Sequence, residues 1–521
     1  MKRYLLKRIL FSLFSVFVVV GAVMILVYTS IDRELVFVGD AAISHKINNE
    51  LEMYKIDKYQ KYGYLTYENY SNSVANKYKK IYGDDYVNHE DYQNAVNAIK
   101  QPETYLENYD VNEFRTTYLQ RGYTVKYLPP KYSGTTLVSN PYLVAYRDLS
   151  IFNRLFKYFG NMFKFETIND VKDEKLTNRY IRWEWDKRSN MPALVGSGTT
   201  HKYLIYFDNK FPFIHQNIFH LNLGKSYTTY RDMDLVEVFN QNTGEVYFTD
   251  QEWPSQIGTG VTHSSSYDYH TVTYNSGELQ PIEMEMYSDR YTIALQQKNG
   301  ISRMANSFII GIIATVLVYV LGLPIGIWMA TRKDKLPDKV GNLYIIFVSA
   351  IPTLAYIFML ASIGMTVFGL PYKFATAQTK ILGYIMPILS LTLPSVAGLM
   401  RWMRRYMVDQ MNSDYVKFAR SQGLSEGETF AKHIAPNAFI YLVHDVPASV
   451  LGALTGAMLT EKVYGVPGVG GLLVNAINLH DNAVIVAMAL FYTVLSIVAI
   501  ILGDLLLAKY DPRITFAEGG N

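Results

Sequence analysis

Charged side chains gather in one segment, Arg401 to His433, which lies between two long apolar runs. An Asp, Lys or Arg costs about 2.5 to 3.5 kcal/mol at the centre of a membrane helix, so this segment is expected to lie in water. Within it, the stretch from Asp414 to Glu428 combines charged side chains with aromatic and aliphatic ones. That mixture suits non-covalent docking on another protein rather than a covalent reaction.

The local pattern of this segment predicts a short helix that ends at a glycine. Four residues follow the i, i+3, i+4, i+7 spacing of one helix face: Tyr415, Phe418, Ala419 and Gln422. Ser413 or Asp414 can cap its start. Gly423 ends it, because glycine accepts the left-handed conformation, and Leu424 is placed to fold back on Phe418 or Ala419 in a Schellman-type closure.

A second helix is predicted directly after this glycine. Ser425 and Glu428 have the S-x-x-E spacing of a capping box. The product is a helix, a glycine hinge and a helix that project from the membrane. The geometry alone leaves two interpretations open: an element that docks into a groove of a partner protein, or an ordinary cytosolic helical hairpin.

Motifs of the common enzyme classes are absent from the sequence. It contains no G-x-x-x-x-G-K-[S/T] phosphate loop, no H-E-x-x-H and no G-x-S-x-G elbow. It also has no cysteine, which excludes disulfides and cysteine-based metal sites or nucleophiles. We therefore expect no catalytic residue, no metal site and no cofactor in this chain, and we expect any energy to come from a partner.

Six segments are long and apolar enough to cross a membrane of about 30 Å hydrocarbon thickness. They are Ile9–Ser30, Met304–Ala330, Val340–Tyr372, Ile381–Met400, Ala438–Thr460 and Asn482–Leu502. The first is read as an uncleaved anchor rather than a signal peptide, because its apolar part is too long and Val27 to Ser30 offer no small-x-small cleavage site. The third has room for a re-entrant or interfacial portion, with kinks expected at Pro352 and Gly364.

Basic residues set the expected orientation. They precede the first span, follow the second near Arg332, and follow the fourth at Arg401, Arg404 and Arg405. Because basic residues stay on the cytoplasmic side, both termini are expected in the cytoplasm and residues 31–300 outside the cell.

Residues 31–300 are predicted to form a separate α+β domain. Thirty of the 43 tyrosines lie there. The part up to Tyr118 reads as helical, and strands are predicted from Tyr123 onward, with β-prone runs at Lys202–Phe207, Glu245–Phe248 and Ile282–Met286. Arg182–Asp186 contains two tryptophans, which fit either a recognition surface or a core strand.

The charged hairpin resembles the cytoplasmic coupling loop of ABC importer permeases, and the peptide and nickel (OppB-like) branch is the most similar. The resemblance rests on an ordered set of motifs: Asp414 to Ser425, His433, Pro436-Asn437, Glu461 to Gly470, His480-Asp481 and Asp511-Pro512-Arg513. It covers roughly Ser302 to Ile514 and the first span. The Glu-Ala-Ala signature of the loop survives only as Ala419 and Gly423, so the whole segment carries the resemblance.

The resemblance implies a polytopic α-helical membrane protein with the type I importer permease fold and an extracellular domain inserted between the first two spans. Its implied units are residues 1–30, 31–300, 301–514 with a coupling loop at 401–436, and a tail at 515–521. The coupling contact would come from Asp414, Tyr415, Lys417, Phe418, Ala419, Arg420, Gly423, Leu424 and Ser425. The implied partners are a second homologous permease, two ATPase subunits that bind ATP and Mg²⁺, and a lipid-anchored extracellular peptide-binding protein, in the plasma membrane and without nucleic acid.

Pore or gate candidates come from two places. His444 and Asp445 lie in the inner part of the fifth span, where the family is mostly apolar; they fit either a role in the transport path or snorkelling toward the cytoplasm. Glu461, Pro467 and Gly468 match the family's outer loop, which implies a scoop at the pore mouth, with an ordinary surface turn as the alternative. Gly452-x-x-x-Gly456 allows close helix approach, which predicts a contact with a second permease subunit; the alternative is the general richness of membrane helices in glycine.

The large insertion departs from common peptide permeases and resembles Gram-positive oligopeptide permeases of the AmiC type. It is expected to dock or orient the binding protein. The resemblance implies ATP-driven import of oligopeptides by alternating access. The alternatives are another cargo, such as a dipeptide or nickel chelate, and a mechanotransmission or sensor subunit, which usually has fewer later spans.

Overall fold

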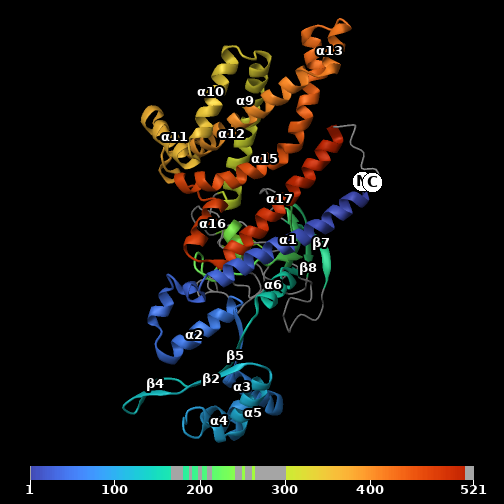
Figure 1. Cartoon of the computed structure of the whole chain (residues 1–521). Coiled ribbons are helices and arrows are strands. Elements are labelled where there is room, and N and C mark those ends of the chain that lie inside the picture. Colours follow the sequence, from blue (N-terminus) through green and yellow to red (C-terminus); the bar gives the residue numbers. More distant parts are fainter. Residues whose placement is uncertain are drawn as a thin grey trace.

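The computed structural model describes residues 2–165, 180–186, 190–196, 202–207, 214–216, 218–240, 249–252, 261–264 and 301–510. These residues form a bundle of long apolar helices with the inserted region at one end (Figure 1). The coupling hairpin projects from the opposite end. The insertion and the hairpin therefore lie at the two extremes of the molecule.

Five described helices are long and apolar enough to cross a membrane. They are α1 (Lys2–Ser30), α9 (Arg303–Thr331), α12 (Lys380–Met411), α15 (Ala435–Tyr464) and α17 (Asn482–Tyr510). The predicted spans correspond to these helices, although α12 continues eleven residues beyond Met400 and carries its arginines on the helix.

The third predicted span is a bent pair. α10 (Leu336–Ala350) and α11 (Thr353–Phe368) meet at an angle of 111°. The predicted kink at Pro352 is confirmed, because this residue caps the start of α11. The kink predicted at Gly364 is wrong: α11 runs through it, and a β-carbon there would come within 2.5 Å of the Met386 sulfur, so this glycine serves close helix packing.

α9 lies between α12 and α15 and packs closely on both. A β-carbon at Gly326 would approach the Met403 side chain at 2.8 Å, and one at Gly311 would approach Leu454 at 2.9 Å. Small residues at helix crossings let backbones approach without a hydrophobic driving force in lipid. A short helix, α16 (Val469–Asn478), follows α15 and leads to α17.

The far part of the insertion is a tyrosine-rich subdomain. Three helices, α3 (Tyr70–Tyr82), α4 (Glu90–Ala98) and α5 (Tyr109–Gln120), cover an antiparallel sheet of order β1-β5-β2 (Leu65–Asn69, Tyr142–Asp148, Thr124–Leu128). Its core combines tyrosines such as Tyr70 with aliphatic residues of the sheet. The predicted change from helices to strands near Tyr123 is confirmed, with β1 as an earlier strand.

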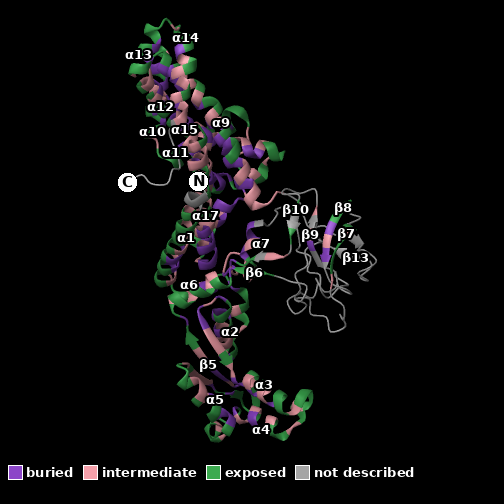
Figure 2. Cartoon of the chain, turned by 90° about the vertical axis from the view of Figure 1, so that its right-hand side faces the viewer, coloured by how far each residue is buried: buried purple, intermediate pink, exposed green. Residues whose placement is uncertain are grey.

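A second sheet has the order β10-β9-β8-β7, from Ile214–Gln216, Lys202–Phe207, Met191–Gly196 and Ile181–Asp186. It stands to the side of α7 (Leu235–Asn240) in Figure 2. The strand predicted at Lys202–Phe207 is confirmed. Trp183 and Trp185 on β7 are both exposed, so they are not part of a core within the described residues. The runs predicted at Glu245–Phe248 and Ile282–Met286 lie outside the described residues. Three two-stranded pairs complete the described strands: β3–β4 (Lys131–Ser133, Thr136–Ser139), β6–β11 (Phe163–Phe165, Phe219–Leu221) and β12–β13 (Thr249–Glu252, Val261–Ser264).

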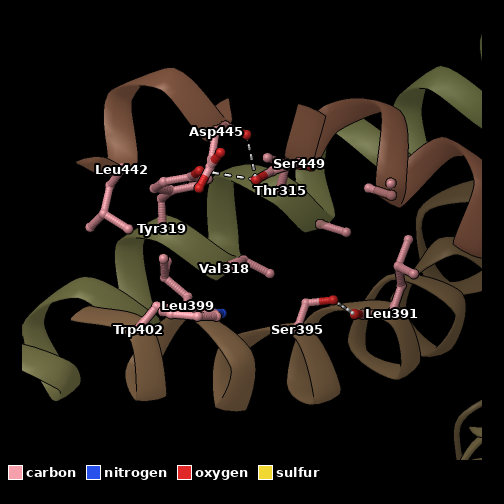
Figure 3. A pocket seen from close by; sticks show the side chains of 13 residues that line it. Thr315, Val318, Tyr319, Leu391, Ser395, Leu399, Trp402, Leu442, Asp445 and Ser449 are labelled. Carbon is pink, nitrogen blue, oxygen red and sulfur yellow. Dashed lines mark hydrogen bonds between the residues drawn. The ribbon is translucent and has the colours of Figure 1, made fainter. Parts of the chain in front are cut away.

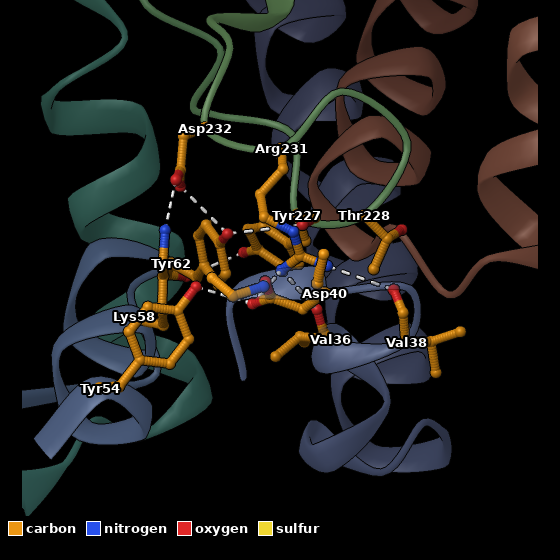
Figure 4. Close-up of polar contacts among 12 residues, drawn as sticks. Val36, Val38, Asp40, Tyr54, Lys58, Tyr62, Tyr227, Thr228, Arg231 and Asp232 are labelled. Carbon is orange, nitrogen blue, oxygen red and sulfur yellow. Dashed lines mark hydrogen bonds and ion pairs between the residues drawn. The ribbon is translucent and has the colours of Figure 1, made fainter. Parts of the chain in front are cut away.

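The near part of the insertion is the part next to the membrane helices. There, ion pairs join Arg231 and Asp232 to the segment between α1 and the end of α2 (Figure 4). Arg231 pairs with Asp40 at 3.2 Å and donates to the carbonyl oxygens of Val36 and Val38. Lys58 of α2 (Asn48–Lys61) pairs with Asp232. Burial by itself raises the pKa of the Asp232 carboxyl, but the hydrogen bond and charge of Lys58 outweigh it and hold that pKa below its usual value.

Candidate functional site

The predicted helix-glycine-helix hairpin is present. α13 (Asp414–Ser421) ends in a Schellman motif in which Leu424 N–H donates to the Ala419 carbonyl at 3.4 Å and Gly423 N–H donates to the Arg420 carbonyl at 3.0 Å. Gly423 has φ +85°, which disfavours other residues. α14 (Glu426–Thr429) begins with the predicted Ser425/Glu428 capping box.

The spacing placed four residues on one helix face and left open whether that face docks on a partner. In the structure Val416 and Ala419 are buried, whereas Tyr415 is partly exposed and Phe418 is 62% exposed. Phe418 therefore faces outward, where a partner can reach it.

The cap of α13 differs from the prediction in detail. Ser413 occupies the N-cap position, but its hydroxyl donates to the Asp409 carbonyl at 3.2 Å instead of capping the helix. Asp414 forms an ion pair with Lys417 at 2.8 Å, and this hydrogen bond lowers the pKa of the Asp414 carboxyl. Across the glycine, Arg420 pairs with Glu426 at 3.0 Å and ties the two short helices together.

The hairpin is attached to two long helices at once. One apolar cluster contains buried residues of α12, α13, α15 and the stretch before α15: Met403, Met407, Val416, Ile434, Ala438 and Leu442. α14 passes into α15 through a π-helical stretch, Phe430–Ile434. A displacement of α13 must therefore move α12 and α15 together.

α12 is joined in turn to α10 by a bidentate ion pair. Arg404 donates from Nε and Nη2 to the two carboxylate oxygens of Asp338, at 2.5 and 2.7 Å. Asp338 is 1% exposed and also accepts from the Asp334 backbone and the Asn342 side chain. This buried carboxylate fastens the first turn of α10 to the hairpin end of α12.

A cavity of about 380 Å³ lies between α9, α12 and α15 (Figure 3). Its lining mixes apolar side chains with polar ones such as Thr315 and Ser395, and a hydrogen-bonded polar group lies at one edge. There Tyr319 hydrogen-bonds the Ser449 hydroxyl at 3.0 Å, and that hydroxyl also donates to the Asp445 carbonyl at 2.8 Å. Gly452 lines the same cavity, whereas a β-carbon at Gly456 would meet Leu391 of α12 within this chain at 2.9 Å.

The two polar residues of the fifth span take different positions. Asp445 lines the cavity. His444 is not among the lining residues and approaches α17, where its Nε2 lies 3.7 Å from Asp504, which also pairs with Arg8 of α1 at 2.9 Å. The two side chains also contact each other, since His444 Nδ1 lies 3.2 Å from Asp445 Oδ1.

Glu461, Pro467 and Gly468 lie together at the turn between α15 and α16. The Glu461 carboxylate is buried and accepts from the Ser307 hydroxyl at 2.5 Å and the Gly471 N–H at 2.9 Å. Asn306 donates to the Pro467 carbonyl at 2.9 Å. The turn is thus packed on the start of α9, away from the residues that line the cavity.

Asp481 is the main residue that the sequence analysis did not assign. It is fully buried and accepts hydrogen bonds from the Ser226 hydroxyl at 2.6 Å and from the backbone N–H groups of Tyr227, Thr228 and Thr229 at 3.0 to 3.1 Å. The loop before α17 therefore holds a turn of the insertion through one carboxylate. The His480-Asp481 motif marked the position, but its partner lies 255 residues away.

Among the described residues, no three His, Asp or Glu side chains lie close enough together to hold a metal ion. The arrangement offers two things instead: a cavity at the junction of three long helices, and an exposed hairpin fixed to two of them.

Comparison with known proteins agrees with this arrangement. Residues 322–516 match the family described as "Binding-protein-dependent transport system inner membrane component". The chain is 32% identical to the oligopeptide transport system permease protein AmiC of Streptococcus pneumoniae, over 100% of both chains. It is 31% identical to the dipeptide transport system permease protein DppB of Lactococcus lactis and 30% identical to DppB of Bacillus subtilis, in each case over 41% of this chain and 69% of the relative. This chain therefore belongs to the family of ABC transporter permeases that includes AmiC and DppB.

Proposed function

We propose that this chain is one transmembrane subunit of an ATP-driven importer of oligopeptides. The carrying observation is the similarity to AmiC along the whole chain, insertion included, whereas the dipeptide permeases match only 41% of it. ATP hydrolysis is assigned to two separate ATPase subunits that bind ATP and Mg²⁺. A second homologous permease and a lipid-anchored extracellular peptide-binding protein complete the assembly.

The proposed topology has six spans in the plasma membrane, with the bent pair α10 and α11 counted as one. Both termini and the hairpin lie in the cytoplasm, and residues 31–300 lie outside. The basic residues near Arg8, Arg332 and Arg404 support this orientation, because they lie at the hairpin side of their helices.

The coupling step is assigned to the exposed side of the hairpin. Phe418 and Tyr415 present an aromatic surface to the ATPase subunit, and Lys417 and Arg420 lie on the same short helix. Because Val416 packs in one cluster with residues of α12 and α15, closure of the ATPase dimer would tilt both helices. The Arg404–Asp338 pair extends the movement to α10, which changes the cavity from inward-facing to outward-facing.

The cavity between α9, α12 and α15 is assigned to the transport path. Asp445, Ser449 and Tyr319 supply its polar edge, while Leu391 and Leu399 supply apolar wall. Such a lining suits cargo held through its backbone with few side-chain demands. His444 is assigned a structural role, since it contacts α17, and the Glu461 turn is assigned to holding the outer end of α15 against α9.

The insertion is assigned to docking the binding protein over the pore. A domain fixed beside the pore raises the effective concentration of whatever it binds. The Asp481 contact supports this assignment, because it fixes the insertion to the loop between α16 and α17.

The test replaces the exposed aromatic residue of the hairpin and measures both coupling and transport. Phe418→Ala is expected to reduce co-purification of the ATPase subunits and to lower uptake of a labelled oligopeptide at least tenfold. Ile381→Ala is the matched control, because Ile381 is also a highly exposed apolar residue and lies at the end of α12 far from the hairpin. Because both side chains are exposed, neither substitution should prevent membrane insertion.

Unchanged uptake and ATPase retention in Phe418→Ala would overturn the coupling assignment. Uptake of dipeptides or of a nickel chelate in place of longer peptides would overturn the assignment of oligopeptides as the cargo. An assembly that hydrolyses ATP in response to peptide while none crosses the membrane would instead indicate a sensor.

A further inference from the structure

Helix α6 (Ile151–Gly160) belongs to the insertion but packs beside the membrane helix α1 (Figures 1 and 2). A β-carbon at Gly21 of α1 would lie 3.3 Å from the Leu155 side chain. The ring of Phe17 lies 6.0 Å from that of Phe156 and 5.3 Å from that of Phe159. The contact thus involves the middle of α1 and not only its end.

The position along α1 gives the depth of this contact. Gly21 lies nine residues before Ser30, the last residue of α1, which is about 14 Å along the axis at about 1.5 Å per residue. The 24-residue span is about 36 Å long and exceeds a hydrocarbon core of about 30 Å by about 6 Å. Even if all of that excess protruded outside, Leu155 would meet α1 about 8 Å below the hydrocarbon boundary.

α6 also exposes large apolar side chains beside the Leu155 contact. Phe152 is 66% exposed and Phe156 is 63% exposed. The β6–β11 ribbon that follows α6 continues this surface, since Phe163 and Phe165 are also exposed and both rings contact that of Phe219, at 5.4 and 5.3 Å. A cluster of exposed phenylalanines of this kind is unfavourable in water and marks a contact with lipid or protein.

The polar residues of α6 lie where an interfacial helix needs them. Arg154 donates to the carbonyl oxygens of Leu149 and Tyr64, and its guanidinium lies 5.1 Å from the ring of Tyr28 near the outer end of α1. Lys157 is exposed and can extend toward lipid headgroups. Phenylalanines on one side and basic residues beside them are typical of helices embedded at a membrane surface.

We propose that α6 and the β6–β11 ribbon are embedded in the outer leaflet of the membrane, where Phe152, Phe156 and Phe165 contact acyl chains. Lipid is the occupant because this surface continues from the exposed apolar side of α1, which includes Phe14 next to Phe17. The inference rests on the proposed orientation, in which the insertion lies outside. It gives the insertion a second attachment to the membrane, separate from the Asp481 contact.

The chain has no cysteine, so single-cysteine variants can be labelled directly. Phe152→Cys and Phe156→Cys would carry a nitroxide in the complete transporter in liposomes, and collisions with oxygen and with a water-soluble nickel chelate would be measured. Phe14→Cys on α1 is the lipid control, and Tyr109→Cys on α5 is the water control, because both native side chains are highly exposed. Both variants keep Leu155 and Phe159 against α1, and Phe156→Cys removes only the more distant ring contact with Phe17.

The expected result is that labels at 152 and 156 collide with oxygen several times more often than with nickel, as at 14, and that 109 shows the reverse. Nickel accessibility equal to that at 109 would overturn the proposal, because the surface would face water. Low accessibility to both reagents would overturn it as well, because protein would cover the surface. If the labels report lipid but oligopeptide uptake is absent, the proposed cargo fails and this inference stands.

Discussion

Arg404 and Asp338 form a bidentate ion pair between α12 and α10, with Nε to Oδ1 at 2.5 Å and Nη2 to Oδ2 at 2.7 Å. The pair lies at the hairpin end of the bundle, and Asp338 is buried. Since α12 also carries the cluster that holds α13, this pair decides whether α10 follows the hairpin.

Arg404→Lys is expected to separate ATP hydrolysis from transport. A lysine is a point charge and cannot make two parallel hydrogen bonds to one carboxylate, so the fixed angle between α10 and α12 is lost at a cost of about 1 to 3 kcal/mol. We expect the number of ATP molecules hydrolysed per peptide imported to rise several-fold. Arg405→Lys is the control, because its pair with Asp409 spans 4.0 Å and is exposed. An equal rise in both variants would contradict this role.

Asp481→Ala is expected to release the insertion from the membrane core. It removes the acceptor of four close hydrogen bonds and leaves the buried N–H groups of Tyr227, Thr228 and Thr229 without a partner. We expect a loss of about 3 kcal/mol or more, seen as faster limited proteolysis between α7 and α9. Ser226→Ala removes a single hydrogen bond to the carboxylate and should cost only about 1 kcal/mol. Equal protease resistance of the Asp481 variant and the parent protein would exclude this anchor.

Gly468→Ala is expected to disrupt the turn after α15. An alanine β-carbon would lie 2.2 Å from the Glu461 carboxylate, and φ at Gly468 is −110°, so the effect comes from contact and not from backbone strain. We expect a lower yield of folded protein, measured by size-exclusion chromatography in detergent. Glu461→Ala in the same chain should restore part of that yield. Gly398→Ala is the control, because nothing lies within 4 Å of its β-carbon.

The stability of the near part of the insertion is expected to fall in acid. Lys58 holds the pKa of Asp232 below its usual value, even though burial alone raises it. A carboxyl with a lowered folded pKa stabilises the fold above its unfolded pKa of about 3.9, and this stabilisation is lost as pH falls through the folded value. Hydrogen exchange of α2 should therefore accelerate below about pH 4. In Lys58→Met, the α2 amides should be less protected from exchange at pH 7, and their exchange should change less as the pH falls. If the pH dependence of exchange is unchanged in this variant, groups other than Asp232 cause it.

Single cysteines also test the proposed orientation. A membrane-impermeant maleimide added to intact cells should label Tyr109→Cys at once and Phe418→Cys only after permeabilisation. Both native side chains are exposed in this chain, so neither reaction is limited by burial when the chain is expressed without its ATPase subunits. Labelling of Phe418→Cys in intact cells would show that the hairpin lies outside and that the proposed orientation is wrong.

The hairpin could be predicted in detail because its signals are local. Gly423 and Leu424 close the Schellman motif, and Ser425 and Glu428 form the capping box, as their spacing indicated. The packed face was harder to predict: Val416 is buried because Met403 and Ile434 lie above it, and both belong to other helices. Local spacing predicts a helix and its ends, but tertiary neighbours decide which side is buried.

The functional contacts of distant segments could not be predicted. His444 and Asp445 are adjacent in sequence, yet one approaches α17 and the other lines the cavity. Pro352 marked the bend between α10 and α11, whereas Gly364, an equally plausible kink, serves close packing against Met386. The presence of a glycine in a helix does not indicate whether it allows a kink or allows a neighbouring helix to pack closely.

The contact between Ser226 and Asp481 also constrains how the chain is made. Residue 226 leaves the ribosome 255 residues before its partner. The donors of the Tyr227 to Thr229 turn therefore lack this acceptor until the loop before α17 has been made. In the proposed orientation, a ribosome stalled before that loop would leave an unfinished domain exposed on the cell surface to proteases.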